Sequence, residues 1–235
     1  MTDIAATPRR VMMPAFTPFI VVGLVHVLAL AVGADAVAHP SKWLLMPALG
    51  FALLWAVRPT RNVAVLTTLA AIGLSWAGDV IVDIPGDLTF VLGLTAFLLA
   101  HVVYIVLFVR VLRLRRTAWW SIVYAVWFVA FLVVLAPYLG ALLVPVAVYG
   151  LVLGSMAATA ARGGALLAVG GALFVASDTV LALARFLPGF GLPLKDSIVM
   201  AGYITAQGLI VLGVARIVLA ARARSARVAS VSASA

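Results

Sequence analysis

The chain has 235 residues, of which 66% are hydrophobic and only 10% are charged, and its mean hydropathy is +1.26. A water-soluble domain cannot bury that much apolar surface, so the composition excludes one and indicates a polytopic membrane protein. The net charge of +9 does not favour nucleic-acid binding, because nearly all the arginines lie in short turns between apolar segments. Cysteine is absent, which excludes disulfides and thiolate metal sites.

At roughly 20 residues per span the chain has room for about seven to nine transmembrane helices, and we predict eight. Their expected ranges are 16–34, 43–57, 63–84, 88–111, 118–136, 139–161, 164–185 and 197–220. Long apolar runs separated by proline, glycine or arginine are typical of spanning helices. The second run is short, and Pro47 inside it predicts a kink or an early end. One domain over residues 1–221 would then be followed by a disordered basic tail over 222–235.

The positions of the basic residues support this division of the chain. The expected inner turns and termini hold twelve arginines, namely Arg9, Arg10, Arg58, Arg61, Arg110, Arg113, Arg115, Arg116, Arg162, Arg222, Arg224 and Arg227. The expected outer turns hold three basic residues, Lys42, Arg185 and Lys195. This asymmetry predicts an all-α bundle of eight transmembrane helices with both termini in the cytoplasm. Alternatively, the first apolar run is a signal peptide that is cleaved near "ADA" at 34–36, which would leave seven spans.

Two aspartates are expected deep inside the membrane. Asp79 in the third predicted helix and Asp178 in the seventh both lie about 21–24 Å from the inner face of a hydrocarbon core about 30 Å thick. An ionised carboxylate is costly there, so such residues are candidates for function. Small residues precede each of them, Ala77-Gly78 and Ala176-Ser177, and allow helices to approach closely. The pair either divides the roles of acid and base or is structural, buried against Arg185, Tyr203 or backbone amides.

Other polar residues extend this candidate site. His101 and Tyr104 share one face of the fourth predicted helix, and Tyr203 and Gln207 share one face of the eighth. Each pair either lines a polar cavity or hydrogen-bonds a neighbouring helix. Asp83 follows the first intramembrane aspartate by one turn and is either an interfacial residue, the helix end or part of the site.

The remaining histidines and aspartates have simpler interpretations. We predict that Asp87 and Asp196 cap the helices that they precede, that His26 packs between helices, and that His39 lies in a loop. The three histidines show no metal-binding spacing, so we expect no zinc site and no cofactor.

Several stretches together carry a family resemblance. Gly78-Asp79 is followed by "FVLGLTAFLLAHVVYIVLF" at 90–108, "LFVASD" at 173–178 and "KDSIVMAGYITAQGLIV" at 195–211. In this order and spacing the chain resembles the YhhN-like lysoplasmalogenase family of eight-helix membrane proteins, over residues 43–215. The resemblance implies hydrolysis of the vinyl ether bond of lysoplasmalogens, which yields a fatty aldehyde and a glycerophospho-ethanolamine or -choline.

By position, the family's two aspartates fall on Asp79 and Asp178, which the resemblance implies are catalytic. The expected substrate-binding residues are His101, Tyr104, Tyr203, Gln207, Asp83 and Ser177. Family members often carry lysine directly before the proline of the second helix, and this chain has Met46 there, which puts its substrate choice or activity in question.

The expected partners are a lysophospholipid substrate within the bilayer and other membrane lipids, and the expected location is a bacterial cytoplasmic membrane. Acid–base cleavage of a vinyl ether needs a proton donor and a base but no metal. The main alternative is a proton-coupled transporter of a small solute, because intramembrane aspartates also relay protons. A metal-dependent lipid hydrolase and a non-catalytic scaffold are further alternatives. The composition does not indicate an oligomeric state.

Overall fold

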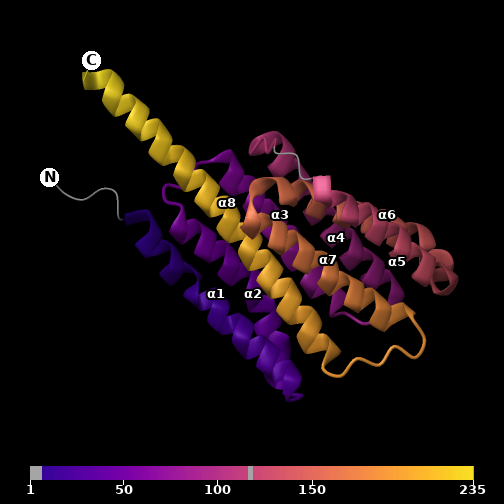
Figure 1. Cartoon of the computed structure of the whole chain (residues 1–235). Helices are drawn as coiled ribbons and strands as arrows, with labels where there is room; N and C mark the ends of the chain where they lie inside the picture. Colours follow the sequence, from indigo (N-terminus) through magenta and orange to yellow (C-terminus); the bar gives the residue numbers. More distant parts are fainter. Residues whose placement is uncertain (1–6, 116–118, 235) are drawn as a thin grey trace.

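The computed structural model describes residues 7–115 and 119–234, and within these ranges the chain is all-α without a strand. Arg116, predicted in an inner turn, and Ala118, predicted to start the fifth span, lie outside the described residues. The α-helices are α1 (Thr7–Ala31), α2 (Asp35–Ala56), α3 (Val63–Val82), α4 (Asp87–Val106), α5 (Val123–Leu139), α6 (Leu143–Ala160), α7 (Ala165–Phe186) and α8 (Lys195–Ser234) (Figure 1). A π-helical turn (Leu107–Val111) extends α4, and 3-10 turns (Trp119–Ile122, Gly140–Leu142, Ala161–Gly163) flank α5 and α6.

Six helical stretches of the described residues are long and apolar enough to cross a membrane. They are Pro14–Ala31, Val63–Val82, Asp87–Val111, Trp119–Gly163, Ala165–Phe186 and Lys195–Ser232. The fourth of these covers both α5 and α6, and α2 is not among them. The protein is therefore an integral membrane protein of helical type. A spanning role for α2 and the cytoplasmic side of the termini stay predictions.

The helix α2 begins earlier than the sequence predicts. It starts at Asp35, so His39, predicted in a loop, and Lys42, predicted in an outer turn, both lie within the helix. The acidic side chain of Asp35 suits the positive end of the helix dipole in the first turn. The helix also continues past Pro47 to Ala56, because its following turns are fixed by burial in the core.

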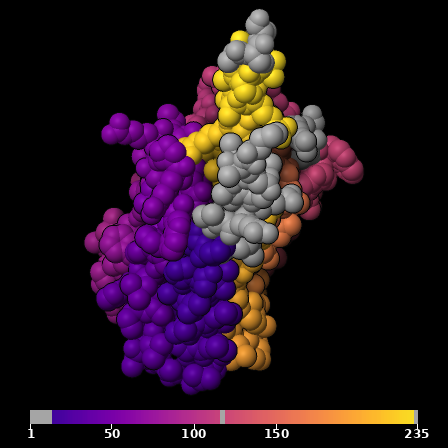
Figure 2. Space-filling view, turned by 90° about the vertical axis from the view of Figure 1, so that its left-hand side faces the viewer, coloured from indigo at the N-terminus to yellow at the C-terminus, as the bar shows by residue number. Residues whose placement is uncertain are grey.

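The C-terminal segment is helical where the sequence predicts disorder. The helix α8 continues through Ser234, and Figure 2 shows it projecting beyond the rest of the bundle. Residues 222–234 hold alanine, arginine and serine without proline or glycine, and alanine and arginine favour a helix. At the start of this stretch the guanidinium of Arg222 donates hydrogen bonds to the carbonyl oxygens of Arg58 (3.2 Å) and Pro59 (2.6 Å). These bonds hold α8 to the α2–α3 connection.

Close helix contacts at two adjacent glycines fix α7 between α6 and α8. A Cβ atom added to Gly170 would lie 3.0 Å from the carbonyl oxygen of Ala206 in α8. A Cβ added to Gly171 would lie 3.0 Å from the Cα of Ala157 in α6. Only glycine permits both approaches, which are typical of membrane helix packing. Because Asp178 lies two turns further along α7, this packing places it beside α6 and α8.

Candidate functional site

Asp79 of α3 and Asp178 of α7 line the same cavity, which has a volume of about 590 Å³. The cavity lies among α3 to α8, and one residue of α2, Lys42, also lines it. Its walls are mainly apolar and include Leu94, Phe97, Trp127, Phe131, Val146, Leu153 and Val199. A space of this size with apolar walls and a few polar groups is typical of a small-molecule site.

Each of the two carboxyl groups accepts a hydrogen bond from a tyrosine. The hydroxyl of Tyr203 in α8 donates to Oδ2 of Asp79 at 2.8 Å, and the hydroxyl of Tyr149 in α6 donates to Oδ2 of Asp178. Both tyrosines line the cavity. Asp79 is only 4% exposed, so its bond lies in a place that water hardly reaches. Each bond engages one oxygen of a carboxyl group that itself lines the cavity.

Tyr149 is a site residue that the sequence analysis missed. Its signal is a single hydroxyl in the apolar run "PVAVYGLVLG", where a buried tyrosine needs a hydrogen-bond partner. That signal does not name the partner, because the contact with Asp178 depends on how α6 packs against α7.

Small residues beside the site allow its helices to approach. A Cβ atom added to Gly78 would lie 2.7 Å from two atoms of the Phe97 ring in α4, and one added to Gly202 would lie 3.1 Å from the Cβ of Ser177. The hydroxyl of Ser177 donates to the carbonyl oxygen of Val199 in α8 at 2.7 Å. The predicted contribution of small residues to close helix approach is therefore confirmed at both aspartates.

A buried layer, here called the floor, lies beyond the cavity. It consists of Ser75, His101, Tyr104, Phe174 and Gln207, which do not line the cavity. The hydroxyl of Tyr104 donates to Gln207 Oε1 at 2.6 Å, and Gln207 Nε2 donates to Ser75 Oγ at 3.0 Å. The floor thus ties α4, α8 and α3 together one turn beyond the residues that touch the cavity.

His101 forms the aromatic part of the floor. Its ring makes edge-on contacts with the rings of Tyr149 and Phe174, and the ring centroids lie 5.5 Å and 4.6 Å away. Neither ring nitrogen makes a hydrogen bond of normal geometry, and the backbone of Phe97 is the polar group beside the ring. His101 therefore supports the tyrosine that holds Asp178 rather than contacting the cavity itself.

Charged residues line the other end of the cavity, here called the mouth. They are Lys42, Asp87, Arg185, Lys195 and Asp196. Lys42 is paired with Asp83, whose Oδ2 also accepts a bond of 3.1 Å from Trp43 Nε1. Arg185 lies 3.8 Å from Asp87 and places its guanidinium 3.8 Å from the centre of the Phe90 ring. The mouth therefore carries three cations and two carboxylates, and two of the cations, Lys42 and Arg185, face the carboxylates of Asp83 and Asp87.

A model of the YhhN family matches residues 37–214 of the chain, which includes every residue that lines the cavity. The chain belongs to the YhhN family. No curated protein and no solved structure gives a match.

The structure of this YhhN-family protein separates the predicted site residues into three groups. Those that line the cavity are Asp79, Asp178, Ser177 and Tyr203. Those in the floor are His101, Tyr104 and Gln207. The third group is Asp83 alone, which follows the end of α3 and reaches the mouth through its pair with Lys42. Among the described residues, no three histidine or aspartate side chains gather into a group that could hold a metal ion.

Several single-residue predictions also have outcomes. Asp87 lies in the first turn of α4, but Gly86 is the N-cap and no side chain caps it, so the predicted capping bond is wrong. Its side chain points to solvent, where it lies near Arg185 instead. His26 packs between helices as expected, because its Nδ1 lies 3.0 Å from both the Ala38 carbonyl oxygen and Ser41 Oγ.

The position where family members often carry lysine is filled by a core residue. Met46 is completely buried, while Lys42, one helical turn earlier, lines the cavity. The chain therefore has a cation on this part of α2, one turn closer to the mouth.

Proposed function

We propose that this YhhN-family protein is a membrane-embedded hydrolase that cleaves the vinyl ether bond of lysoplasmalogen-type lysophospholipids. One observation carries the proposal: Asp79 and Asp178, on two different helices, line one cavity, and each is held by a tyrosine hydroxyl. Membership of the YhhN family is consistent with a hydrolase.

Two carboxyl groups are sufficient for the reaction. One, protonated, gives its proton to the vinyl carbon β to the ether oxygen, which leaves an oxocarbenium ion. The other, ionised, takes a proton from water as the water oxygen bonds to the cationic carbon, which forms a hemiacetal. The first group then takes the hemiacetal hydroxyl proton while the second protonates the departing ether oxygen. The products are an aldehyde and an alcohol, and both carboxyls return to their starting states.

The environment of the two carboxyls favours this chemistry. The intermediate is cationic, and an ionised carboxylate in a poorly solvated cavity stabilises a positive charge more strongly than it would in water. Glycosidases use two carboxyls in the same way for a related cationic transition state. Tyr149 and Tyr203 keep the two acidic groups in place by binding one oxygen of each.

The two ends of the cavity match the two ends of a lysophospholipid. The mouth holds charges of both signs, as a phospho-ethanolamine or -choline headgroup does. Its cations, Lys42, Arg185 and Lys195, suit the phosphate, and its carboxylates, Asp87 and Asp196, suit the ammonium group. The apolar walls suit the single hydrocarbon chain. With the phosphate at the mouth and the chain between the helices, the ether bond near the glycerol lies between these regions, where Asp79 and Asp178 are placed.

The test is release of aldehyde from lysoplasmalogen by purified protein in detergent. Asp79→Asn and Asp178→Asn should each lower the rate by about 10²–10⁴-fold, the usual contribution of a general acid or base. Asp35→Asn, an exposed carboxyl in the first turn of α2 outside the cavity, is the matched control and should keep full activity. Aldehyde release that survives both substitutions would remove the proposal.

A further inference from the structure

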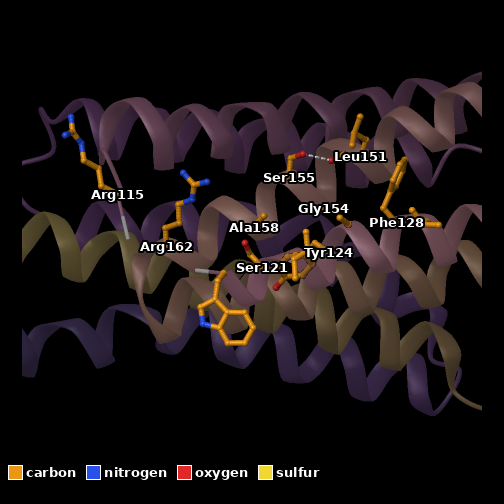
Figure 3. A pocket seen from close by; sticks show the side chains of 13 residues that line it. Arg115, Ser121, Tyr124, Phe128, Leu151, Gly154, Ser155, Ala158 and Arg162 are labelled. Carbon is orange, nitrogen blue, oxygen red and sulfur yellow. Dashed lines mark hydrogen bonds between the residues drawn. The ribbon is translucent and has the colours of Figure 1, made fainter. Parts of the chain in front are cut away.

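A second cavity, of about 610 Å³, lies between α5 and α6 and shares no lining residue with the first. Its walls are formed by Trp119, Ser121, Ile122, Tyr124, Ala125, Phe128, Val129, Leu151, Gly154, Ser155 and Ala158, together with Arg115 and Arg162. Figure 3 shows both arginines at one end of this groove and the apolar side chains along the rest of it. We call it the α5–α6 groove.

Within the described part of the chain, the two arginines are charges without a counter-charge. Neither Arg115 nor Arg162 has an ion pair or a side-chain hydrogen bond with the described residues, and no carboxylate lines the groove. Both side chains are exposed. Two such guanidinium groups at one end of a cavity favour an anion.

The rest of the groove is apolar and faces outward. Val129 is 61% exposed and Leu151 54%, and both belong to a stretch that is apolar enough to span the membrane. Trp119 is 82% exposed beside the arginines, a position typical of tryptophan at the membrane interface. A Cβ added to Gly154, which lines the groove, would lie 3.4 Å from the ring of Trp127 in α5, so the two helices approach closely beside the groove.

We propose that the α5–α6 groove binds one anionic phospholipid of the surrounding bilayer. Its phosphate lies at Arg115 and Arg162, and one acyl chain lies along Phe128, Leu151 and Gly154. A soluble anion would use only the charged end, and a zwitterionic lipid would leave the two arginine charges only partly neutralised. Because the groove combines a cationic end with an apolar length, it favours an anionic lipid over both.

The experiment measures lipid binding to delipidated full-length protein by native mass spectrometry, with phosphatidylglycerol and phosphatidylcholine of identical acyl chains. We expect one phosphatidylglycerol to bind each chain more tightly than phosphatidylcholine. An arginine near a lipid surface contributes about fivefold in affinity, so Arg115→Gln and Arg162→Gln should each raise the Kd about fivefold and the double variant about thirtyfold.

Two controls separate this site from general attraction. Arg224→Gln removes an exposed arginine of α8 outside the groove and should leave the Kd unchanged. Ser155→Phe fills the groove without changing its charge and should weaken binding. Ser155 is exposed and its hydroxyl bonds only within its own helix, so this variant should fold.

Three results would overturn the proposal: equal affinity for the two lipids, an equal loss in Arg224→Gln, or full binding by Ser155→Phe. Displacement of the lipid by millimolar inorganic phosphate would also overturn it, since the acyl chain would then contribute nothing. Catalytic activity is not a readout, so the outcome is independent of the proposed hydrolysis.

Discussion

Removal of one phenolic oxygen, by Tyr203→Phe, tests whether the hydrogen bond to Asp79 supports catalysis. Tyr203 and Asp79 are each 4% exposed, so bulk solvent has little access to the place of the lost donor. The ring keeps its edge contacts with Phe97 (centroids 6.0 Å apart) and Phe174 (5.4 Å), so packing changes little. A hydrogen bond to a charged group is worth about 1.5–3 kcal/mol. If Asp79 must be held in the transition state, the rate falls roughly 10- to 150-fold.

The assay is the turnover of lysoplasmalogen to aldehyde, measured together with thermal unfolding in detergent. The matched control is Tyr104→Phe, which removes a buried tyrosine hydroxyl that donates to Gln207 in the floor and touches no carboxyl. It should lower stability by about 1–3 kcal/mol, because Gln207 loses a buried partner, but lower the rate by less than about threefold. Equal losses of activity in the two variants, or full activity in Tyr203→Phe, would refute the reasoning.

Two further predictions concern the mouth and the packing of α3. Lys42→Met should raise the KM for a phosphate-bearing substrate about tenfold, because the charged contact with the phosphate is lost. Lys42→Arg keeps the charge and should leave the KM unchanged. An unchanged KM in Lys42→Met would remove Lys42 from headgroup binding. Gly78→Ala should destabilise the fold by about 1–3 kcal/mol, because its Cβ would overlap Phe97. Gly73→Ala, on the same helix, is the control, because a Cβ at this position would have nothing within 4 Å. It should be neutral or stabilising in the same unfolding assay. Equal changes in stability for the two variants would contradict the packing argument.

The centre of the site could be predicted because carboxylates inside a membrane are rare and costly. The chain has no glutamate and seven aspartates, and Asp79 and Asp178 are the two that fall deep within apolar runs. Helical rise alone gives them a similar depth, and the structure places both in one cavity. Tyr203 followed as a polar residue on the eighth predicted helix and as one of the partners considered for the two aspartates, and in the structure it donates a hydrogen bond to Asp79.

The other partners of these residues could not be predicted, because they depend on how helices rotate and pack. Tyr149 looks like an ordinary aromatic residue until α6 packs against α7 and its hydroxyl meets Asp178. Lys42 precedes the apolar run of α2, so its sequence suggests a turn, whereas the helix begins at Asp35 and brings the lysine to Asp83. Gln207 shares a helical face with Tyr203, but one turn of distance moves it from the cavity into the floor.

The floor closes the cavity on the side that a transporter would have to open. A transported solute must leave the cavity on the side opposite its entry. In this protein that side is closed by Tyr104 and Gln207, which are completely buried and hydrogen-bonded, and by His101 and Phe174, which are 1% exposed. Opening a path would break the bonds from Tyr104 through Gln207 to Ser75. It would also separate the edge-on contact of the His101 ring with Tyr149, the tyrosine that holds Asp178. A hydrolase needs no such path, because a lipid substrate can enter and its products can leave through the mouth or between helices.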